Sequence, residues 1–276
     1  MKVELRSERP ISYPIRLKLF PGVCPLSLRK PTSTSFCLLI SLFLTGAVAR
    51  AEAPKSFKID DVPRIKQLTN YCGPAVVSAV FKHFGREISQ ETVGKAVYDP
   101  SSRATSGSDM LLFGQENGFA AYSWNSGIED VKSKLAAGLP VIVLQQNSLT
   151  DTSGHYRVLT GYDDASSKFY AMDPYYDEIT ELSYPKCEQL WHPTGHWALI
   201  YVPPARDAFR DQLGARNPVL HMDLSLARFK RKEYDQALQE ANKALALEPG
   251  NSYALSILGK IKKALGAGSQ GSGAGE

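Results

Sequence analysis

The sequence predicts an α+β domain followed by a small all-α segment. Three observations lead to this fold class. Apolar residues recur with helical spacing between residues 73 and 117, and short apolar runs with strand character follow from Gly118 onward. Beyond residue 204 the spacing is purely helical again. A helical lobe therefore precedes a lobe built on an antiparallel sheet, and the cleft between two such lobes is the natural place for chemistry.

The chain opens with a segment that is typical of a secretory signal. Residues 36–49, "FCLLISLFLTGAVA", follow basic residues and are apolar, but about 14 residues fall short of the roughly 20 that span a bilayer as a helix. Small residues precede a cleavage point after Ala51. We therefore predict a signal peptide over residues 1–51, a linker over residues 52–61 and a periplasmic or secreted protein, with an uncleaved membrane anchor as the alternative.

Composition excludes the more unusual classes of protein. The chain has 276 residues, of which 43% are apolar and 22% are charged, and these values are ordinary for a globular protein. The formal net charge of +4 is small, and no block of Lys and Arg resembles a nucleic-acid-binding stripe. We expect no nucleic-acid partner, and no stable membrane span once the signal is cleaved.

Three helices are predicted in the first lobe, over residues 73–84, 89–98 and 108–117. Pro74 suits the first turn of a helix, because its missing N–H would have no partner there. Ser89 and Ser108 are the predicted N-caps of the second and third helices. Cys72 is therefore expected at the start of the first helix.

The second lobe is expected to contain most of the strands. A short strand is predicted over 119–124, a helix over 127–138 that ends at Gly138, and a buried strand over 139–146. Further strands are predicted over residues 155–162, 168–173, 178–183 and 196–202. The polar stretch "GYDDASSK" predicts a hairpin turn between the first two of these four.

The C-terminal residues resemble a tetratricopeptide repeat. Residues 218–251 span the length of one repeat and carry the repeat's small, apolar and proline positions at Leu224, Tyr234, Ala237, Ala244 and Pro249. A second repeat starts at Ser252 and stops after one helix. We assign tetratricopeptide-like helices to residues 205–265 and a flexible Gly/Ser tail to residues 266–276. Since a lone repeat cannot bury its apolar face, it should pack on the first domain or on a protein partner.

The cysteines are too few for a disulfide framework. Cys24 and Cys37 lie in the predicted signal, which leaves Cys72 and Cys187 in the mature chain. One bridge between these two is the structural alternative to a reactive thiol. No Cys-x-x-Cys occurs and the five histidines are scattered, so we expect neither a metal nor another cofactor.

Four residues could supply the groups that a thiol nucleophile needs. A helix N-terminus favours an anion, so the pKa of Cys72 is expected to fall there. His155 opens a predicted strand and could act as the base, while Asp173 ends the next strand and would lie near it if the two strands pair. Gln67 carries an amide that could donate to an oxyanion. Each of the last three, taken alone, is also an ordinary surface, turn or loop residue.

Taken in order, these residues resemble a known family. Gln67, the Cys-Gly pair at Cys72, the "HY…TGYD" strand from His155 and the Asp-Pro pair at Asp173 are similar to the motifs of the bacteriocin-processing, double-glycine-type cysteine peptidases. That family is a branch of the papain-like fold. The resemblance implies that Cys72 is the nucleophile, His155 the base, Asp173 the residue that orients it, and Gln67 the oxyanion donor. Tyr71 departs from the acidic residue that transporter-linked members carry.

The resemblance implies a papain-like peptidase domain over residues 62–204, of the stand-alone, exported kind that carries a C-terminal tetratricopeptide segment. The expected activity is hydrolysis of a peptide bond in a peptide or protein, without a cofactor. A peptidyl or acyl transferase on the same fold is the first alternative, because an amine can resolve an acyl-enzyme in place of water. An inactive adaptor that binds a partner through the helical segment is the second.

Overall fold

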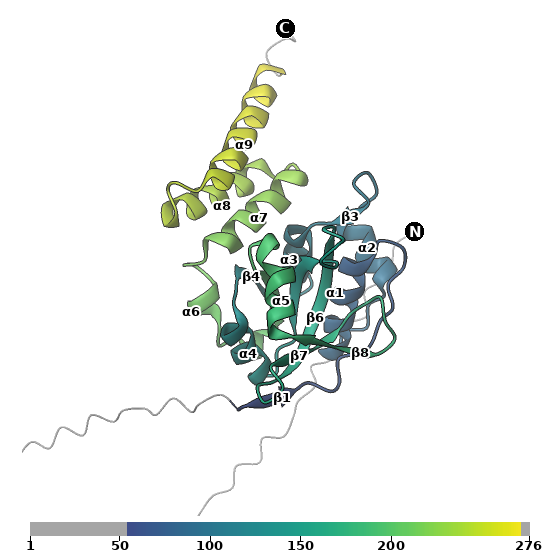
Figure 1. The fold of residues 1–276 in the computed structure, drawn as a ribbon. Helices are drawn as coiled ribbons and strands as arrows, with labels where there is room; N and C mark the ends of the chain where they lie inside the picture. Colours follow the sequence, from purple (N-terminus) through teal and green to yellow (C-terminus); the bar gives the residue numbers. More distant parts are fainter. Residues whose placement is uncertain (1–53, 272–276) are drawn as a thin grey trace, which may run out of the picture. The chain divides into compact units, whose positions relative to one another are not determined.

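The computed structural model describes residues 54–271. The predicted signal peptide, with Cys24 and Cys37, lies outside the described residues. The described part is built on one antiparallel sheet in the order β4-β9-β5-β6-β7-β8, with β1 also pairing with β6 (Figure 1). The strands are β1 (Ser56–Lys58), β4 (Ala120–Asn125), β5 (Val141–Gln146), β6 (Gly154–Asp163), β7 (Lys168–Met172), β8 (Ile179–Ser183) and β9 (Trp197–Val202). A small separate hairpin pairs β2 (Tyr98–Asp99) with β3 (Ala104–Thr105).

The helices flank this sheet and continue beyond it. They are α1 (Cys72–His83), α2 (Gln90–Val97), α3 (Gly107–Glu116), α4 (Ile128–Ala136), α5 (Tyr184–Trp191), α6 (Arg210–Leu213), α7 (Pro218–Lys230), α8 (Tyr234–Leu247) and α9 (Ser252–Gly271). Short 3-10 turns cover His192–Thr194 and Pro204–Arg206. The order of helices before strands follows the predicted α+β arrangement, and every predicted helix and strand of the first 202 residues has its counterpart within two residues at each end.

Strand β6 runs through the middle of the core. Every residue of β6 from His155 to Tyr162 is buried, because α1 and α4 both pack against it while β5, β7 and β1 pair with it. Helix α1 is buried from Gly73 to Phe81, which explains why its sequence is apolar almost all round rather than on one stripe. Because both α1 and β6 are buried and pack on each other, the start of α1 is held close to the start of β6.

The structure differs from the local predictions at three points. Helix α3 begins at Gly107, so its N-cap is Ser106 and the predicted cap, Ser108, lies inside the helix. The residues expected as a linker contain β1, whose edge pairs with β6. Helix α5 was not predicted, although Ser183 caps it by accepting a hydrogen bond from the Lys186 backbone N–H.

The C-terminal helices pack in two groups. Leu220, Leu224 and Ala227 of α7 belong to the same apolar core as the sheet, so this helix buries a face against the first domain. Helices α8 and α9 meet in a separate small cluster around Ala241 and Ile257. Polar contacts also join α7 to the domain, since the Asp223 carboxylate accepts from the Trp197 indole N–H at 2.9 Å. The helical character is as expected, and the assignment to a tetratricopeptide repeat stays a prediction.

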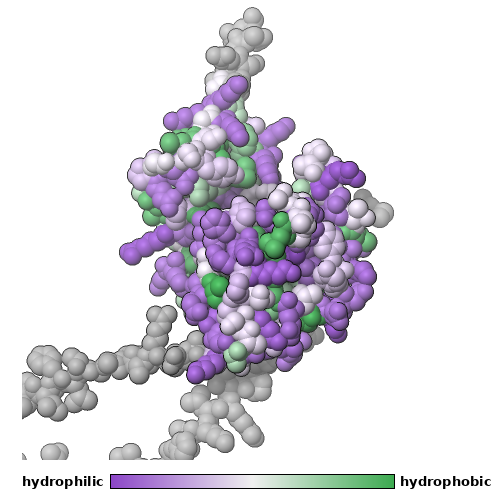
Figure 2. Space-filling model, in the orientation of Figure 1, coloured by the Kyte–Doolittle hydropathy of each residue, from purple (hydrophilic) through white to green (hydrophobic). Residues whose placement is uncertain are grey.

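The face of the protein in Figure 2 is mainly hydrophilic, and its hydrophobic residues form small separate patches. Among the residues that the structure describes, no helix combines the length and apolar character that crossing a membrane requires.

The packing of α7 leads to a prediction about stability. Leu224→Ala should lower the free energy of unfolding of the whole domain by about 2–5 kcal/mol, because it leaves a cavity in the shared core. Leu255→Ala, at an exposed position on α9, should change it by less than about 0.5 kcal/mol. Urea unfolding followed by tryptophan fluorescence measures both. A main transition that Leu224→Ala leaves unmoved would show that α7 unfolds independently of the sheet.

Candidate active site

Cys72 is the first residue of α1, as the sequence predicts. The close packing of the next residue explains the Cys-Gly pair: a Cβ on Gly73 would lie 2.6 Å from the Thr105 side chain of β3. The thiol is partly buried and free, and Cys187 is buried and also free, so the alternative of a bridge between them is not observed. The cysteine therefore stands at a helix start that is pressed against the β2–β3 hairpin.

His155 and Asp173 meet as the strand pairing requires. His155 is the second residue of β6 and Asp173 directly follows β7, and the antiparallel register of these strands brings their ends together. His155 Nε2 lies 2.8 Å from Asp173 Oδ1, and both side chains are almost completely buried. Because an ionised carboxylate can only accept, the imidazole carries its proton on Nε2 and keeps a lone pair on Nδ1.

Arg157 completes this arrangement, and sequence reasoning missed it. Its Nε donates to Asp173 Oδ2 at 2.7 Å, so each oxygen of the carboxylate has its own partner. Arg157 lies two residues after His155 on β6, and the period of a strand puts both on the same face. That spacing, together with the expected pairing of the two strands, was the signal that could have pointed to it.

Gln67 lies beside the thiol. It lines the same cavity as Cys72, and its backbone N–H donates to the Pro174 carbonyl at 2.9 Å, which ties its loop to the segment after Asp173. Within residues 54–271 the Gln67 Oε1 atom is buried and has no hydrogen-bond partner. The unpaired atom is an acceptor, so a donor group of a ligand in the cavity can pair with it.

The cavity beside Cys72 has a volume of about 390 Å³. Its lining combines the loop before α1, the β2–β3 hairpin, the start of β6 and the segment after β7, and includes Gln67, Asn70, Cys72, Arg103, Thr105, Leu144, Gly154, Tyr156 and Tyr175. The volume is within the range of small-molecule and peptide side-chain pockets, about 300–1,000 Å³. The thiol thus opens onto a space that a substrate segment can enter.

Tyr175 covers the imidazole. Its ring stacks on His155 with 4.4 Å between ring centroids and 12° between ring planes, while 47% of its surface stays exposed. Burial raises the pKa of Tyr175, and the nearby charge of Cys72 adds to the shift. The other exposed tyrosine of this segment, Tyr176, does not line the cavity, and Trp124, Trp191 and Trp197 are buried in the core.

Burial dominates the electrostatics of Cys72 and His155. It raises the pKa of Cys72 above its ordinary value of 9.0, although the backbone N–H groups of Tyr156 and Gly73 oppose the shift by favouring the thiolate. Burial also lowers the pKa of His155 below 6.5, against the opposing effect of Asp173. The sequence-based expectation of a lowered thiol pKa was therefore wrong in direction, because burial outweighs the helix N-terminus. Both shifts favour a neutral thiol and a neutral imidazole.

Asp173 is ionised despite its burial. Desolvation alone would raise its pKa, but the hydrogen bond and charge of His155, the charge of Arg157 and the Tyr175 backbone N–H together lower it below 3.8. The Tyr175 N–H donates to Asp173 Oδ1 at 3.1 Å. The carboxylate is thus an acceptor across the whole physiological pH range.

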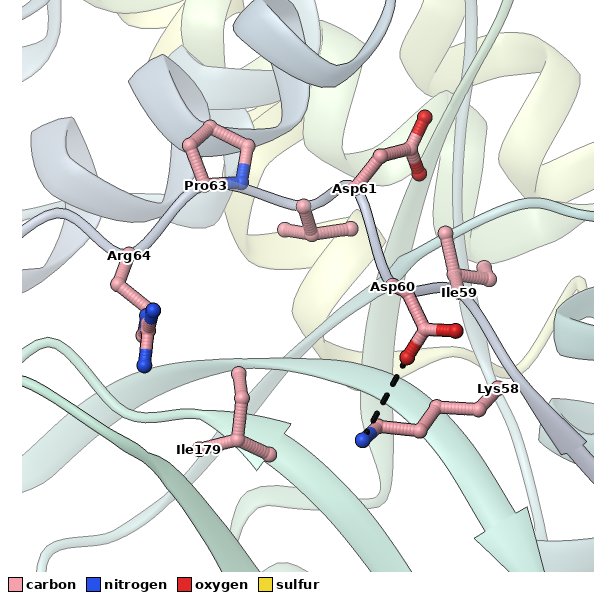
Figure 3. Close-up of a pocket in the computed structure, with 8 residues that line it drawn as sticks. Lys58, Ile59, Asp60, Asp61, Pro63, Arg64 and Ile179 are labelled. Atoms are coloured by element: carbon pink, nitrogen blue, oxygen red, sulfur yellow. Dashed lines mark ion pairs between the residues drawn. The ribbon is translucent and has the colours of Figure 1, made fainter.

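A second hollow has none of these groups. It is lined by residues 58–64 and Ile179, and Figure 3 shows the ion pair between Lys58 and Asp60, with nitrogen and oxygen 3.5 Å apart, at its edge. It contains no cysteine or histidine. Across residues 54–271, no group of three or more His, Cys, Asp or Glu side chains is placed to hold a metal ion.

A comparison with family models assigns the chain. The model described as "Peptidase_C39 like family" matches residues 59–199, which is just over half of the chain. The chain belongs to this family of peptidases. The match confirms the predicted resemblance to double-glycine-type cysteine peptidases. It covers Gln67, Cys72, His155 and Asp173 and ends before α6.

Solved structures of members of the C39 family resemble the described chain at low identity. A C39-like peptidase from Bacillus anthracis is 16% identical, covers 53% of this chain with 97% of its own length, and has a TM-score of 0.45. The peptidase domain of Streptococcus ComA, a bifunctional ABC transporter of a quorum-sensing pathway, is 23% identical, with 51% and 98% coverage and a TM-score of 0.41. A double-glycine-motif protease from an AMS/PCAT transporter, solved with its leader peptide, is 16% identical, with 53% and 94% coverage and a TM-score of 0.43. A search of curated proteins found no significant match to this sequence.

The directions of these pKa shifts make a prediction that needs no substrate. Ultraviolet absorbance of the thiolate, taken as wild type minus Cys72→Ala, should be small at neutral pH and should reach its midpoint above pH 9.0, because burial favours the protonated sulfur.

Cys187→Ala is the matched control and should leave this difference signal in place, since the pKa of Cys187 is raised to about 12. A Cys72 thiolate already present below neutral pH would contradict the neutral pair and would indicate a thiolate–imidazolium ion pair instead.

Proposed function

We propose that the chain is an exported cysteine peptidase that hydrolyses a peptide bond in a peptide or protein. One observation carries the proposal: a carboxylate holds a buried imidazole at 2.8 Å, and the two neighbours of His155 in the sequence, Gly154 and Tyr156, line the same cavity as Cys72. Membership of a peptidase family supports the same activity. On this basis we assign Cys72 as the nucleophile, His155 as the base, Asp173 as the carboxylate that orients the base, and Gln67 as an oxyanion donor.

In the acylation step, the Cys72 sulfur attacks the carbonyl carbon of the scissile bond while Nδ1 of His155 accepts the thiol proton. Asp173 accepts from Nε2 throughout, so it stabilises the imidazolium that forms. The imidazolium then gives its proton to the leaving amine, and the C–N bond breaks. Water, deprotonated by the same nitrogen, hydrolyses the thioester and restores the thiol.

The developing oxyanion needs donors that are in place before the reaction. The first turn of α1 supplies the backbone N–H of Cys72, and the Gln67 side chain lies on the same cavity wall and can supply an amide N–H. Removing one donor of this type lowers kcat by about 10²–10³-fold. A neutral resting thiol suits this scheme, because the charge is then created only as the substrate is attacked.

Because the sequence predicts a signal peptide, we propose that this activity lies in the periplasm or outside the cell. The helices α7–α9 would recruit a protein partner if they act as a tetratricopeptide segment. A transferase would share every step up to the thioester and differ only in the acceptor. An inactive adaptor would keep the fold without using the thiol.

The proposed function leads to a test with a peptide library analysed by mass spectrometry. Wild type should cleave a subset of peptides, and Cys72→Ala should cleave none of them while its thermal midpoint stays within a few degrees, because the substitution removes only one partly buried sulfur.

Cys187→Ala should keep the cleavage pattern, since that thiol lies on α5. Cleavage that persists in Cys72→Ala would remove Cys72 from the reaction. Peptides that gain an added amine acceptor would identify the transferase. A wild type that cleaves nothing and forms no acyl-enzyme would favour the adaptor.

A further inference from the structure

Arg157 makes contacts that the proposed chemistry does not account for. A nucleophile, a base and a carboxylate that orients the base would suffice, and here the second oxygen of that carboxylate is also bound. Arg157 Nε lies 2.7 Å from Asp173 Oδ2, and His155 Nε2 lies 2.8 Å from Oδ1. The carboxylate therefore lies between two cationic or polar donors on the same strand face.

The guanidinium group is itself held from the other side. Its NH1 donates to Gln145 Oε1 at 3.2 Å and to the Gln146 carbonyl at 3.3 Å, and its NH2 donates to the Asn147 carbonyl at 2.9 Å. Gln145, on β5, is in turn held by α5, because its Nε2 donates to the Cys187 carbonyl at 3.3 Å. Arg157 is only 8% exposed, so water cannot replace these partners.

A rigid partner of this kind limits what the carboxylate can do. A buried Asp with one partner can rotate about its terminal torsion, and it would lose its charge more readily because desolvation favours the neutral acid. With Oδ2 fixed on a planar guanidinium, Oδ1 has one orientation and the negative charge is compensated. A series of hydrogen bonds thus runs from Gln145 through Arg157 to Asp173 and ends on the imidazole.

We propose that Arg157 is a positioning residue of the active site: by holding Asp173 Oδ2 it fixes Oδ1 on Nε2 of His155 and so keeps Nδ1 aimed as the base. This inference rests on the proposed function and deepens it, since it adds a residue that acts on the base through the carboxylate. Arg157 does not line the cavity and is not expected to contact the substrate.

The charge of Arg157 also acts on the imidazole. The groups that act on His155 are Asp173 after β7, Arg157 on β6 and Asp151 in the loop before β6, and the ring of Tyr175 stacks on it. Arg157 lowers the pKa of His155, whereas Asp173 and the exposed Asp151 raise it. Removing the guanidinium takes away one of the two effects that lower this pKa, the other being burial, so the imidazole should hold its proton to a higher pH.

The test compares Arg157→Met, Arg157→Lys and wild type. The ring nitrogens of His155 are titrated by ¹⁵N NMR, and kcat and KM are measured on the library peptide that wild type cleaves fastest. For Arg157→Met we expect the His155 pKa and the acidic limb of kcat to move to higher pH, and kcat to fall about 10–100-fold with KM changed less than about twofold. Arg157→Lys keeps the positive charge but not the planar set of guanidinium donors, and should restore the pKa of His155 and part of kcat.

Lys134→Met is the matched control. Lys134 is as deeply buried and pairs with Asp130 at 2.6 Å on α4, so its loss should lower the thermal midpoint without moving the His155 titration. All variants are measured below their thermal midpoints.

An Arg157→Met protein with the wild-type titration and kcat, or with changes equal to those of Lys134→Met, would overturn the proposal. If wild type cleaves no peptide, the proposed function fails, while the NMR titration still decides whether Arg157 sets the state of His155.

Discussion

The site depends on one buried hydrogen bond, between Nε2 of His155 and Oδ1 of Asp173. A carboxylate taken out of water loses its hydration, and this loss is tolerated only where other donors replace it. The imidazole, the guanidinium of Arg157 and the backbone N–H of Tyr175 replace it here. Since the carboxylate accepts at Nε2, the lone pair is left on Nδ1, and the imidazole can act as a base at neutral pH.

That bond exists because of the way the sheet is paired. The antiparallel register of β6 and β7 sets Val158 opposite Met172, so the residues one step further along, Arg157 and Asp173, come to the same end of the sheet. Helix α1 packs on β6, and its first residue, Cys72, lies at this end. The candidate site residues from three separate segments therefore come to one end of the sheet, because the core between them is continuous.

Local patterns in the sequence predicted much of this, and burial decided the rest. Cys72 before Gly-Pro, His155 at a strand start and Asp173 at a strand end follow from turn, cap and strand signals that act within a few residues. The N-cap of α3 was misplaced by two residues because Ser106 and Ser108 satisfy the same rule. Arg157 was missed because a charged residue inside an apolar strand is explained only by its partner across the sheet. The direction of the pKa shift of Cys72 also depends on burial by the whole domain, which the helix start alone does not reveal.

The most direct test of this account is a ¹⁵N NMR spectrum of the ring nitrogens of His155 in the wild-type protein at neutral pH. We expect a neutral imidazole with its proton on Nε2 and an unprotonated Nδ1, because Asp173 accepts at Nε2 and burial disfavours the charged ring. A doubly protonated ring, or a neutral ring with its proton on Nδ1, would contradict the assignment of His155 as a base held by Asp173.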